Sequence, residues 1–252
     1  MTYFISLDGV SLDLPIGGRS LKALFSKPAP TGESSGRIIT QDGNQVCQTI
    51  KNVSLEINSG EKVGLIGGNG AGKTSLLRVL AGIYAPTKGT YKSEGEISTL
   101  FVPTVGMEEN ASGRENIFLA CRTLGFSRAQ VASVQDEIIE FAQLGEFIDQ
   151  PIRLYSAGMR TRLGFAIITS IQPEIVLIDE VFGAGDAAFY KRANQRIKKI
   201  IDKAGILVLA THSPAIIESI CERVIWVDQG EIAFDGDVTE GLNLYAAASK
   251  AG

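Results

Sequence analysis

The sequence predicts an α/β fold in which helices cover both faces of a mostly parallel β-sheet. Short apolar runs indicate four buried strands, and polar segments with helical spacing separate the later ones. The runs are KVGLI at 62–66, IVLID at 175–179, ILVLAT at 206–211 and VIWVD at 224–228. Between about 104 and 172 the spacing is helical and no convincing strand appears. We therefore expect a helical subdomain inserted into a sheet domain.

A glycine-rich loop and a helix are predicted directly after the first of these strands. In TSLLRVLAGI the apolar residues recur at helical spacing, at Leu76, Leu77, Leu80 and Ile83. The inserted subdomain is predicted to contain helices within GRENIFLACRTLG, QVASVQDEIIEFAQL and MRTRLGFAIITSI. Residues 16–48 precede the strand NVSLEI and are rich in Gly, Pro, Ser and Thr, which indicates a partly extended insertion.

One domain of 252 residues accommodates all these elements, and an apolar share of 44% is ample for a buried core. We expect the sheet core to comprise 1–103 and 173–235, and the helical subdomain to comprise 104–172. Residues 236–252 are expected to form a C-terminal tail.

Composition excludes several classes of protein. A net charge of −4 argues against an extended basic surface, so no nucleic-acid partner is expected. The cysteines Cys47, Cys121 and Cys221 are far apart and form no CxxC pair, which predicts reduced thiols and no zinc site. No run approaches the roughly 18 consecutive apolar residues of a membrane span, and the start lacks signal-peptide features. We expect no direct membrane insertion, so any membrane association requires a partner.

The residues GGNGAGKT satisfy the pattern G-x-x-x-x-G-K-[ST]. Glycines allow the backbone to wrap closely around phosphate groups, with successive N–H groups directed inward. An ordinary glycine-rich turn is the alternative, but the position between a strand and a helix favours phosphate binding. The expected ATP-binding residues are Gly67, Gly68, Asn69, Gly70, Ala71, Gly72, Lys73, Thr74 and Ser75.

Carboxylates for a metal ion and a water molecule are expected at the end of a neighbouring strand. Lys73 would supply charge to the β- and γ-phosphates, and the hydroxyl of Thr74 is a natural Mg²⁺ ligand. Asp179 ends IVLID and is the expected second magnesium partner, acting directly or through water. Glu180 follows and is placed to orient or deprotonate the attacking water.

His212 is the only histidine and directly follows ILVLAT. A lone histidine after a strand is more often a structural hydrogen-bonding group than a catalytic one. Ligands of open α/β sheets, however, lie beyond the carboxyl ends of the strands. We therefore expect His212 to contact the γ-phosphate and to position Glu180.

With these residues the chain resembles the nucleotide-binding subunits of ABC transporters, most specifically in LYSAGMRTRLGFAIITSIQPEIVLIDEVFGAGD. The resemblance implies a P-loop NTPase (RecA-like) core with a mostly parallel sheet, an N-terminal antiparallel β subdomain and an inserted α-helical subdomain. It implies that Ser156, Ala157, Gly158 and Met159 form the signature, which contacts the ATP held by a second copy. Asp186 would end the loop that crosses this dimer interface. The implied cofactors are ATP and Mg²⁺.

The signature YSAGMRTRLGFA, the segment GAGDAAF and the early RSLKALF are similar to the subfamily that exports surface polysaccharides such as O-antigen, capsule or teichoic acid. The resemblance implies a homodimer of ATPase subunits that associates with an integral membrane permease at the cytoplasmic face of the cell membrane. Closure of the dimer on ATP would move a permease helix held in a groove of the helical subdomain. The carbohydrate-binding domain of some members is not expected after this ATPase.

Two positions depart from the family pattern. Val102 or Thr104 stands where a Gln or an acidic residue usually approaches Mg²⁺ and water. Residues 46–49, VCQT, stand where an aromatic that stacks on adenine is expected. Phe25 or Tyr3 is our hypothesis for that role.

Rival functions leave two alternatives open. A GTPase would need an N-K-x-D motif, which the sequence lacks. An ABC protein acting on ribosomes or DNA would typically contain paired ATPase halves, a long coiled coil or a basic surface. A regulatory module that binds ATP and hydrolyses it weakly stays open because of the altered segment at 102–104, as does an ABC ATPase for another substrate.

Overall fold

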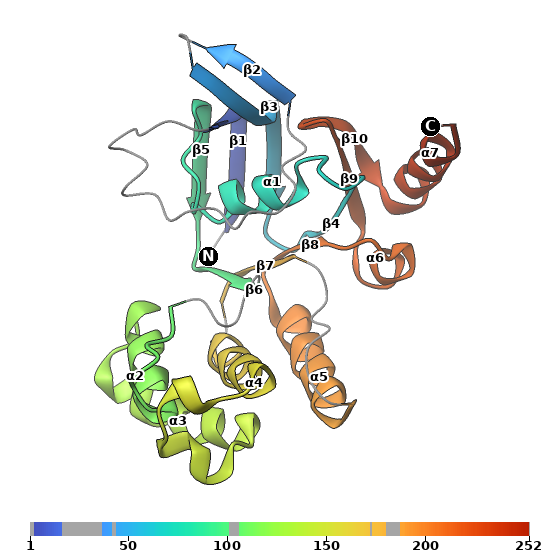
Figure 1. Ribbon diagram of the computed structural model, residues 1–252. Helices are drawn as coiled ribbons and strands as arrows, with labels where there is room; N and C mark the ends of the chain where they lie inside the picture. Colours follow the sequence, from blue (N-terminus) through green and yellow to red (C-terminus); the bar gives the residue numbers. More distant parts are fainter. Residues whose placement is uncertain are drawn as a thin grey trace. The chain divides into compact units, whose positions relative to one another are not determined.

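The computed structural model divides the chain into two compact units (Figure 1). The first unit comprises residues 1–97, 177–180 and 205–252, and the second comprises 98–176 and 181–204. The described residues are 3–16, 37–41, 44–100, 106–171, 173–179 and 187–251.

An antiparallel sheet forms one part of the first unit. Its strands are β1 (Phe4–Pro15), β2 (Arg37–Gln41), β3 (Asn44–Asn58) and β5 (Lys88–Glu94), in the order β2-β3-β1-β5. All three pairings are antiparallel, which confirms the expected N-terminal β subdomain. In the first part of β1 alternate residues are buried, so that Ile5 lies opposite Ile57 and Leu7 opposite Leu55 in the core.

The hairpin of β2 and β3 corrects the sequence-based prediction for the insertion. The strand was expected at NVSLEI, from Asn52, but β3 begins at Asn44. It extends because β1 continues to Pro15 and offers backbone groups opposite Val46. The ladder therefore includes residues that were predicted from the sequence to lie in a partly extended insertion before the strand.

A second sheet carries the predicted buried strands. Within the first unit its order is β10-β9-β4-β8-β7. β4 is parallel to both β8 and β9, and β10 is antiparallel to β9. The four predicted runs correspond to β4, β7, β8 and β9 within one residue at either end. The bounds are β4 (Lys62–Ile66), β7 (Ile175–Asp179), β8 (Ile206–Ala210), β9 (Arg223–Asp228) and β10 (Glu231–Asp237).

Helices α1 (Lys73–Leu80), α6 (Pro214–Ile220) and α7 (Val238–Ala251) belong to the first unit. The predicted apolar face of α1 is confirmed at Leu76, Leu77 and Leu80, which are fully buried. Ile83 is 54% exposed instead, because α1 ends at Leu80 and Gly82 adopts a φ of 67° that an α-helix cannot contain. The predicted tail contains α7, which packs on β9 and β10, with the Tyr245 ring 5.7 Å from that of Trp226.

The second unit is mainly helical and begins with residues of β6 (Ile97–Leu100). Its helices are α2 (Gly113–Thr123), α3 (Arg128–Ala142), α4 (Ala157–Ile168) and α5 (Ala187–Lys203), with 3-10 helices at Gly145–Asp149 and Ile152–Leu154. Capping boxes begin α2 and α3, since Ser112 pairs with Glu115 and Ser127 with Gln130. The core includes Ile117, Ile138 and Leu163, which are fully buried.

Aromatic and guanidinium groups join α5 to α3 and α4. The Phe189 ring lies 5.7 Å from Phe165 and 5.8 Å from Phe141. The guanidinium of Arg196 lies 4.5 Å from the Phe141 ring centre and forms a 2.9 Å ion pair with Glu137. Burial lowers the pKa of Arg196, and the Glu137 carboxylate opposes that effect.

The three cysteines, Cys47, Cys121 and Cys221, are free and buried. Burial raises the pKa of the Cys221 thiol to about 12. Among the described helices, none has both the length and the apolar character that a bilayer span requires.

Candidate functional site

The glycine-rich loop connects the end of β4 to the start of α1, as the sequence predicted. The ammonium of Lys73 donates hydrogen bonds to the carbonyl oxygens of Gly67 at 2.8 Å and Gly68 at 3.0 Å. Lys73 is only 9% exposed, so a full positive charge lies beneath the loop. A phosphate group seated in the loop would approach that charge directly.

The loop glycines serve two purposes. A Cβ at Gly67 (φ 153°) would lie 2.3 Å from the Val227 carbonyl oxygen, and a Cβ at Gly72 (φ 111°) would lie 2.7 Å from the Thr49 carbonyl oxygen. Packing within the first unit therefore requires glycine at both positions. A Cβ at Gly68, in contrast, would meet no atom of the described part of the chain within 4 Å. The open space over Gly68 suits a ligand that approaches the backbone.

The start of α1 is suited to an anion. Gly72 is the N-cap and makes no side-chain capping bond, and no acidic residue lies in the first turn. First-turn N–H groups and the positive end of the helix dipole therefore face a ligand without competition from a capping side chain. Gly68, Asn69, Gly70 and Thr74 are exposed, whereas Ala71 is buried.

The expected metal and γ-phosphate residues follow β7 and β8. Asp179 is half-buried at the end of β7, and His212 is exposed two residues beyond β8. Because β8 is parallel to β4, His212 follows the same edge of the sheet as the glycine-rich loop. Glu180 and Asp186 lie outside the described residues, as do Val102 and Thr104.

The donor set fits Mg²⁺ bound together with a nucleotide. Within the described ranges no three His, Cys, Asp or Glu side chains come together to hold a metal. Mg²⁺ is typically held by one or two protein groups plus phosphate oxygens. Thr74 and Asp179 are the described residues that would hold it.

Tyr3 lies beside the start of β4, at the end of that strand opposite to the glycine-rich loop. Its backbone N–H donates to Ser59 Oγ at 2.7 Å, just before β4 begins. The loop follows the other end of β4, about 16 Å away at about 3.3 Å per residue. The role of Tyr3 at the adenine stays a prediction, and Phe25 lies outside the described residues.

The predicted signature forms the N-terminus of α4 in the second unit. Ser156 is the N-cap, and its Oγ accepts a 3.2 Å hydrogen bond from the Met159 N–H. Because the oxygen accepts from the helix, the hydroxyl proton is available to donate to an anion. Ser156, Ala157 and Gly158 are exposed.

Packing against the described residues does not explain the glycine at position 158. Of the atoms in the described ranges, a Cβ there would meet only Ser156 Oγ, at an ordinary 3.9 Å, and the backbone is not in the left-handed region. Glycine in a helix costs about 1 kcal/mol relative to alanine. The residue is thus suited to a group that approaches from outside the chain.

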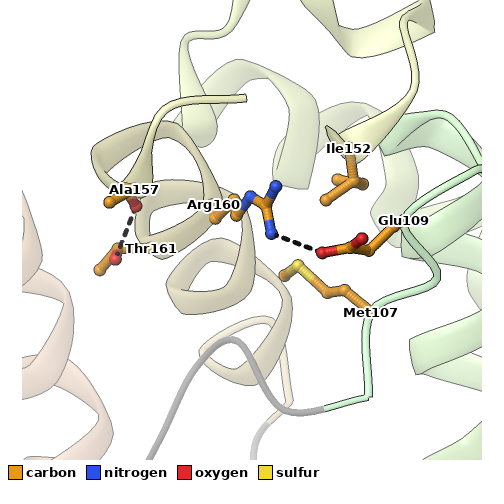
Figure 2. Close-up of a pocket in the computed structure, with 6 residues that line it drawn as sticks. All are labelled: Met107, Glu109, Ile152, Ala157, Arg160 and Thr161. Carbon is orange, nitrogen blue, oxygen red and sulfur yellow. Dashed lines mark hydrogen bonds and ion pairs between the residues drawn. The ribbon is translucent and has the colours of Figure 1, made fainter. Parts of the chain in front are cut away.

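The segment leading to the signature is held by residues 109–111. Backbone N–H groups of Ile152 and Arg153 donate to the carbonyl oxygens of Ala111 and Glu109, both at 3.0 Å. Arg160 of α4 forms a 3.1 Å ion pair with Glu109 across a pocket of about 310 Å³ (Figure 2). The pocket is lined by Met107, Glu109, Ile152, Ala157, Arg160 and Thr161.

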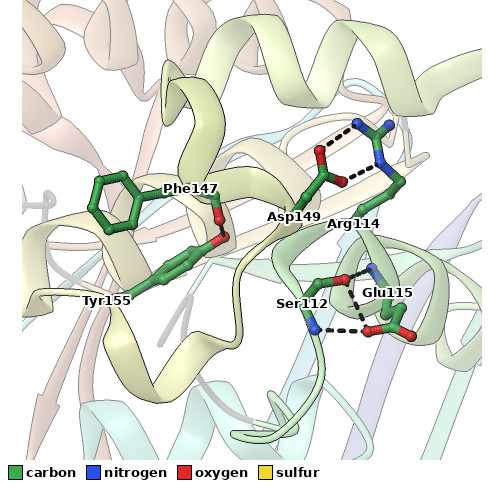
Figure 3. A network of polar contacts seen from close by, with 6 residues as sticks. All are labelled: Ser112, Arg114, Glu115, Phe147, Asp149 and Tyr155. Atoms are coloured by element: carbon green, nitrogen blue, oxygen red, sulfur yellow. Dashed lines mark hydrogen bonds and ion pairs between the residues drawn. The ribbon is translucent and has the colours of Figure 1, made fainter.

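A second polar network secures the same segment (Figure 3). Arg114 Nε donates to Asp149 at 2.8 Å, which holds the pKa of that carboxyl below its ordinary value. The Tyr155 hydroxyl donates to the Phe147 carbonyl oxygen at 2.5 Å. Hydrogen bonds from the Ser112 backbone and hydroxyl likewise lower the pKa of Glu115.

Sequence reasoning missed two positions that shape these loops. Asn116 is 2% exposed, accepts from the Glu108 N–H at 2.7 Å and donates to the Ala111 carbonyl oxygen at 3.2 Å. Gly230 donates its N–H to the Ala71 carbonyl oxygen at 2.8 Å. The dipeptide Gln-Gly between two strands was a signal for the turn, but not for its contact with the loop.

A strand, a glycine-rich loop over a buried lysine and an open helix N-terminus define a P-loop nucleoside triphosphatase. The family model described as "ABC transporter" matches residues 50–183. This chain belongs to the ABC transporter ATPase family, whose members bind and hydrolyse ATP. The resemblance stated from the motifs is thereby confirmed.

Curated relatives cover most of the chain. It is 46% identical over 200 residues to the O-antigen export system ATP-binding protein RfbE of Yersinia enterocolitica, covering 79% of this chain and 84% of that protein. The protein RfbB of Klebsiella pneumoniae, with the same description, is 40% identical over 79% of this chain and 81% of its own length. The teichoic acids export ATP-binding protein TagH of Lactococcus lactis subsp. lactis (strain IL1403) is 39% identical over 78% of this chain but only 42% of its own length.

Solved structures show the same fold. An ATP-binding subunit of an ABC transporter superposes with a TM-score of 0.68 at 19% identity, over 96% of this chain and 93% of its own. A dimeric ATP-binding cassette bound to ADP and phosphate gives 0.64 at 20% identity, over 93% and 98%. The predicted α/β P-loop fold is thus confirmed.

Proposed function

We propose that this chain is the ATPase subunit that powers export of a surface polysaccharide through a separate membrane permease. The observation that carries the proposal is the match of a P-loop chain to relatives named as O-antigen export ATP-binding proteins, at 46% identity over 200 residues. ATP hydrolysis would drive transport at the cytoplasmic face of the cell membrane.

The nucleotide site would be completed by a second copy of the chain. Ser156 offers a hydroxyl proton and a helix N-terminus, and Gly158 leaves its surface open to a close approach. Two copies arranged head to tail would place this signature against the γ-phosphate bound by the partner. Asp186 would lie at the same interface.

Each side chain has a defined role in this site. Lys73 binds the β- and γ-phosphates, while Thr74 and Asp179 hold Mg²⁺, which neutralises charge on the phosphates when bound. Glu180 orients the attacking water and accepts its proton, and His212 contacts the γ-phosphate. Positioning supplies most of the rate in phosphoryl transfer, so each displaced group should be costly.

The permease would contact the helical unit between α2 and α3. A pocket of about 330 Å³ there is lined by Ala111, Arg114, Glu115, Phe118, Leu119 and Gln135. Leu119 is 45% exposed, and the neighbouring charges can orient an amphipathic helix. This surface is the proposed binding site for a cytoplasmic helix of the permease.

The decisive experiment uses a strain deleted for this gene, complemented with wild type or Glu180→Gln. Wild type should restore surface polysaccharide, whereas Glu180→Gln should bind ATP, accumulate as a closed dimer and restore none. Normal polysaccharide in the deleted strain would refute the export function. ATP turnover of Glu180→Gln near the wild-type rate would remove Glu180 from its role.

A second experiment tests the permease contact and the regulatory alternative. Leu119→Arg should abolish stimulation of ATP turnover by the co-purified permease without changing basal turnover. Leu124→Arg is the matched control, because Leu124 is 46% exposed but does not line the pocket. Equal loss of permease stimulation in both variants would refute this pocket as the permease-binding site. Absence of turnover in wild type, with and without permease, would favour a regulatory module.

A further inference from the structure

The turn between β9 and β10 contacts the phosphate-binding loop through backbone groups. Gly230 donates its N–H to the Ala71 carbonyl oxygen at 2.8 Å, and its own carbonyl oxygen accepts from the Lys51 N–H at 2.8 Å. One residue thus bonds to both the loop and β3. These groups all belong to the first unit.

The contact leaves no space for a side chain. Gly230 has a φ of 83°, and a Cβ there would lie 2.8 Å from the Thr49 carbonyl oxygen and 3.3 Å from the Ile50 Cα. A Cβ at Gly72 of the loop would lie 3.4 Å from the Gly230 Cα. Since backbone atoms form this junction, it cannot relax by rotation of a side chain.

We propose that Gly230 is a positioning residue for ATP binding, which fixes the peptide between Ala71 and Gly72 in its nucleotide-ready orientation. In a planar trans peptide the C=O and N–H point in opposite directions. Because the Ala71 carbonyl is bonded to Gly230, the Gly72 N–H is directed away from the turn. Inward N–H groups are what a phosphate-binding loop requires.

An ion pair lies beside the turn, but it does not replace the hydrogen bond from Gly230 to the loop. Lys51 and Glu231 form an ion pair beside Gly230, with side chains 51% and 52% exposed. An exposed pair of this kind contributes little to stability. The backbone bond of Gly230 is therefore the specific link between the turn and the loop. The proposal rests on the ATPase activity of the family and is independent of the exported molecule.

The test compares Gly230→Ala with Gly60→Ala in the purified dimer. Gly60 has a φ of 93°, and a Cβ there would meet none of the described atoms within 4 Å, so its variant has comparable backbone strain without the collision. Because the loop binds phosphates in both ground and transition states, Gly230→Ala should raise the KM for ATP about tenfold and change kcat less than about twofold. Gly60→Ala should leave both constants near wild type.

Three outcomes would overturn the proposal: an unchanged KM in Gly230→Ala, an equal rise in Gly60→Ala, or a fall in kcat at constant KM. Should Gly230→Ala fail to fold, amide hydrogen exchange of the wild-type protein tests the proposed role of Gly230 instead. A non-hydrolysable ATP analogue should slow exchange at the Gly230 N–H about tenfold or more, relative to the Gly60 N–H, which donates to the Gly205 carbonyl oxygen at 2.6 Å. Equal slowing of exchange at the Gly230 and Gly60 amides would refute the role of Gly230 in positioning the loop.

Discussion

Arg223 on β9 bonds three separate segments of the first unit, and its replacement by methionine should destabilise that unit. Its guanidinium donates to both carboxylate oxygens of Asp235, at 2.6 and 2.7 Å. It also donates to Glu61 at 2.8 Å and to the Glu56 carbonyl oxygen at 2.9 Å. Hydrogen bonding to Asp235 raises the pKa of Arg223 despite its partial burial.

The expected loss of folding stability follows from the number of hydrogen bonds that Arg223 makes and from their exposure to water. Hydrogen bonds to charged groups contribute about 1.5–3 kcal/mol each when buried. The Arg223 side chain is 25% exposed, and those of Glu61 and Asp235 are 30% and 28% exposed, so water partly replaces the lost donors. We therefore expect a net loss of about 3 kcal/mol, which lowers Tm by about 6–12 °C at this chain length.

Urea denaturation followed by tryptophan fluorescence measures this change. The chain contains one tryptophan, Trp226, three residues from Arg223 on the same strand. A double-mutant cycle of Arg223→Met with Asp235→Asn should give a coupling energy of about 1–2 kcal/mol. A loss below about 1 kcal/mol, or additive effects in the cycle, would refute the reasoning.

Two further predictions concern the signature and a buried thiol. Ser156→Ala should reduce ATP turnover of the dimer at least about tenfold while leaving ATP binding by the monomer unchanged; Ser127→Ala, which removes a comparable N-cap from α3, should retain turnover and lose only about 1 kcal/mol of stability. Equal loss of turnover in both would exclude a direct role for Ser156. Burial raises the pKa of Cys221 from 9.0 to about 12, so its stabilising contribution is present below pH 9 and declines as pH rises towards 12. Between pH 9 and 11 wild type should lose up to about 1.4 kcal/mol per pH unit more than Cys221→Ala, and parallel stability curves would contradict this.

Local chemistry made much of the first unit predictable from sequence. β4 and β7 have the predicted bounds because each is a buried apolar run. The loop before α1 was predictable because glycine, lysine and threonine have specific roles at fixed spacing. Asp179 and His212 follow their strands as expected.

Contacts distant in sequence were not predictable. Nothing near Asn44 indicates that β3 pairs with the end of β1, or that Gly230 bonds to Ala71. The position of Tyr3 likewise depends on its hydrogen bond with Ser59, which is 56 residues away in the sequence. Such features depend on tertiary contacts between distant segments, which secondary-structure propensity and hydrophobic periodicity do not describe.

The hydrogen bonds of Lys73 have a consequence for which ligands the loop admits. Its ammonium is bonded to the carbonyl oxygens of Gly67 and Gly68, so an incoming ligand must outcompete two neutral acceptors. Adjacent anionic phosphate oxygens meet that condition, because charged acceptors form the stronger bonds. A nucleoside without phosphates offers no such exchange. The hydrogen bonds of Lys73 thus favour ligands with adjacent phosphates over uncharged ligands.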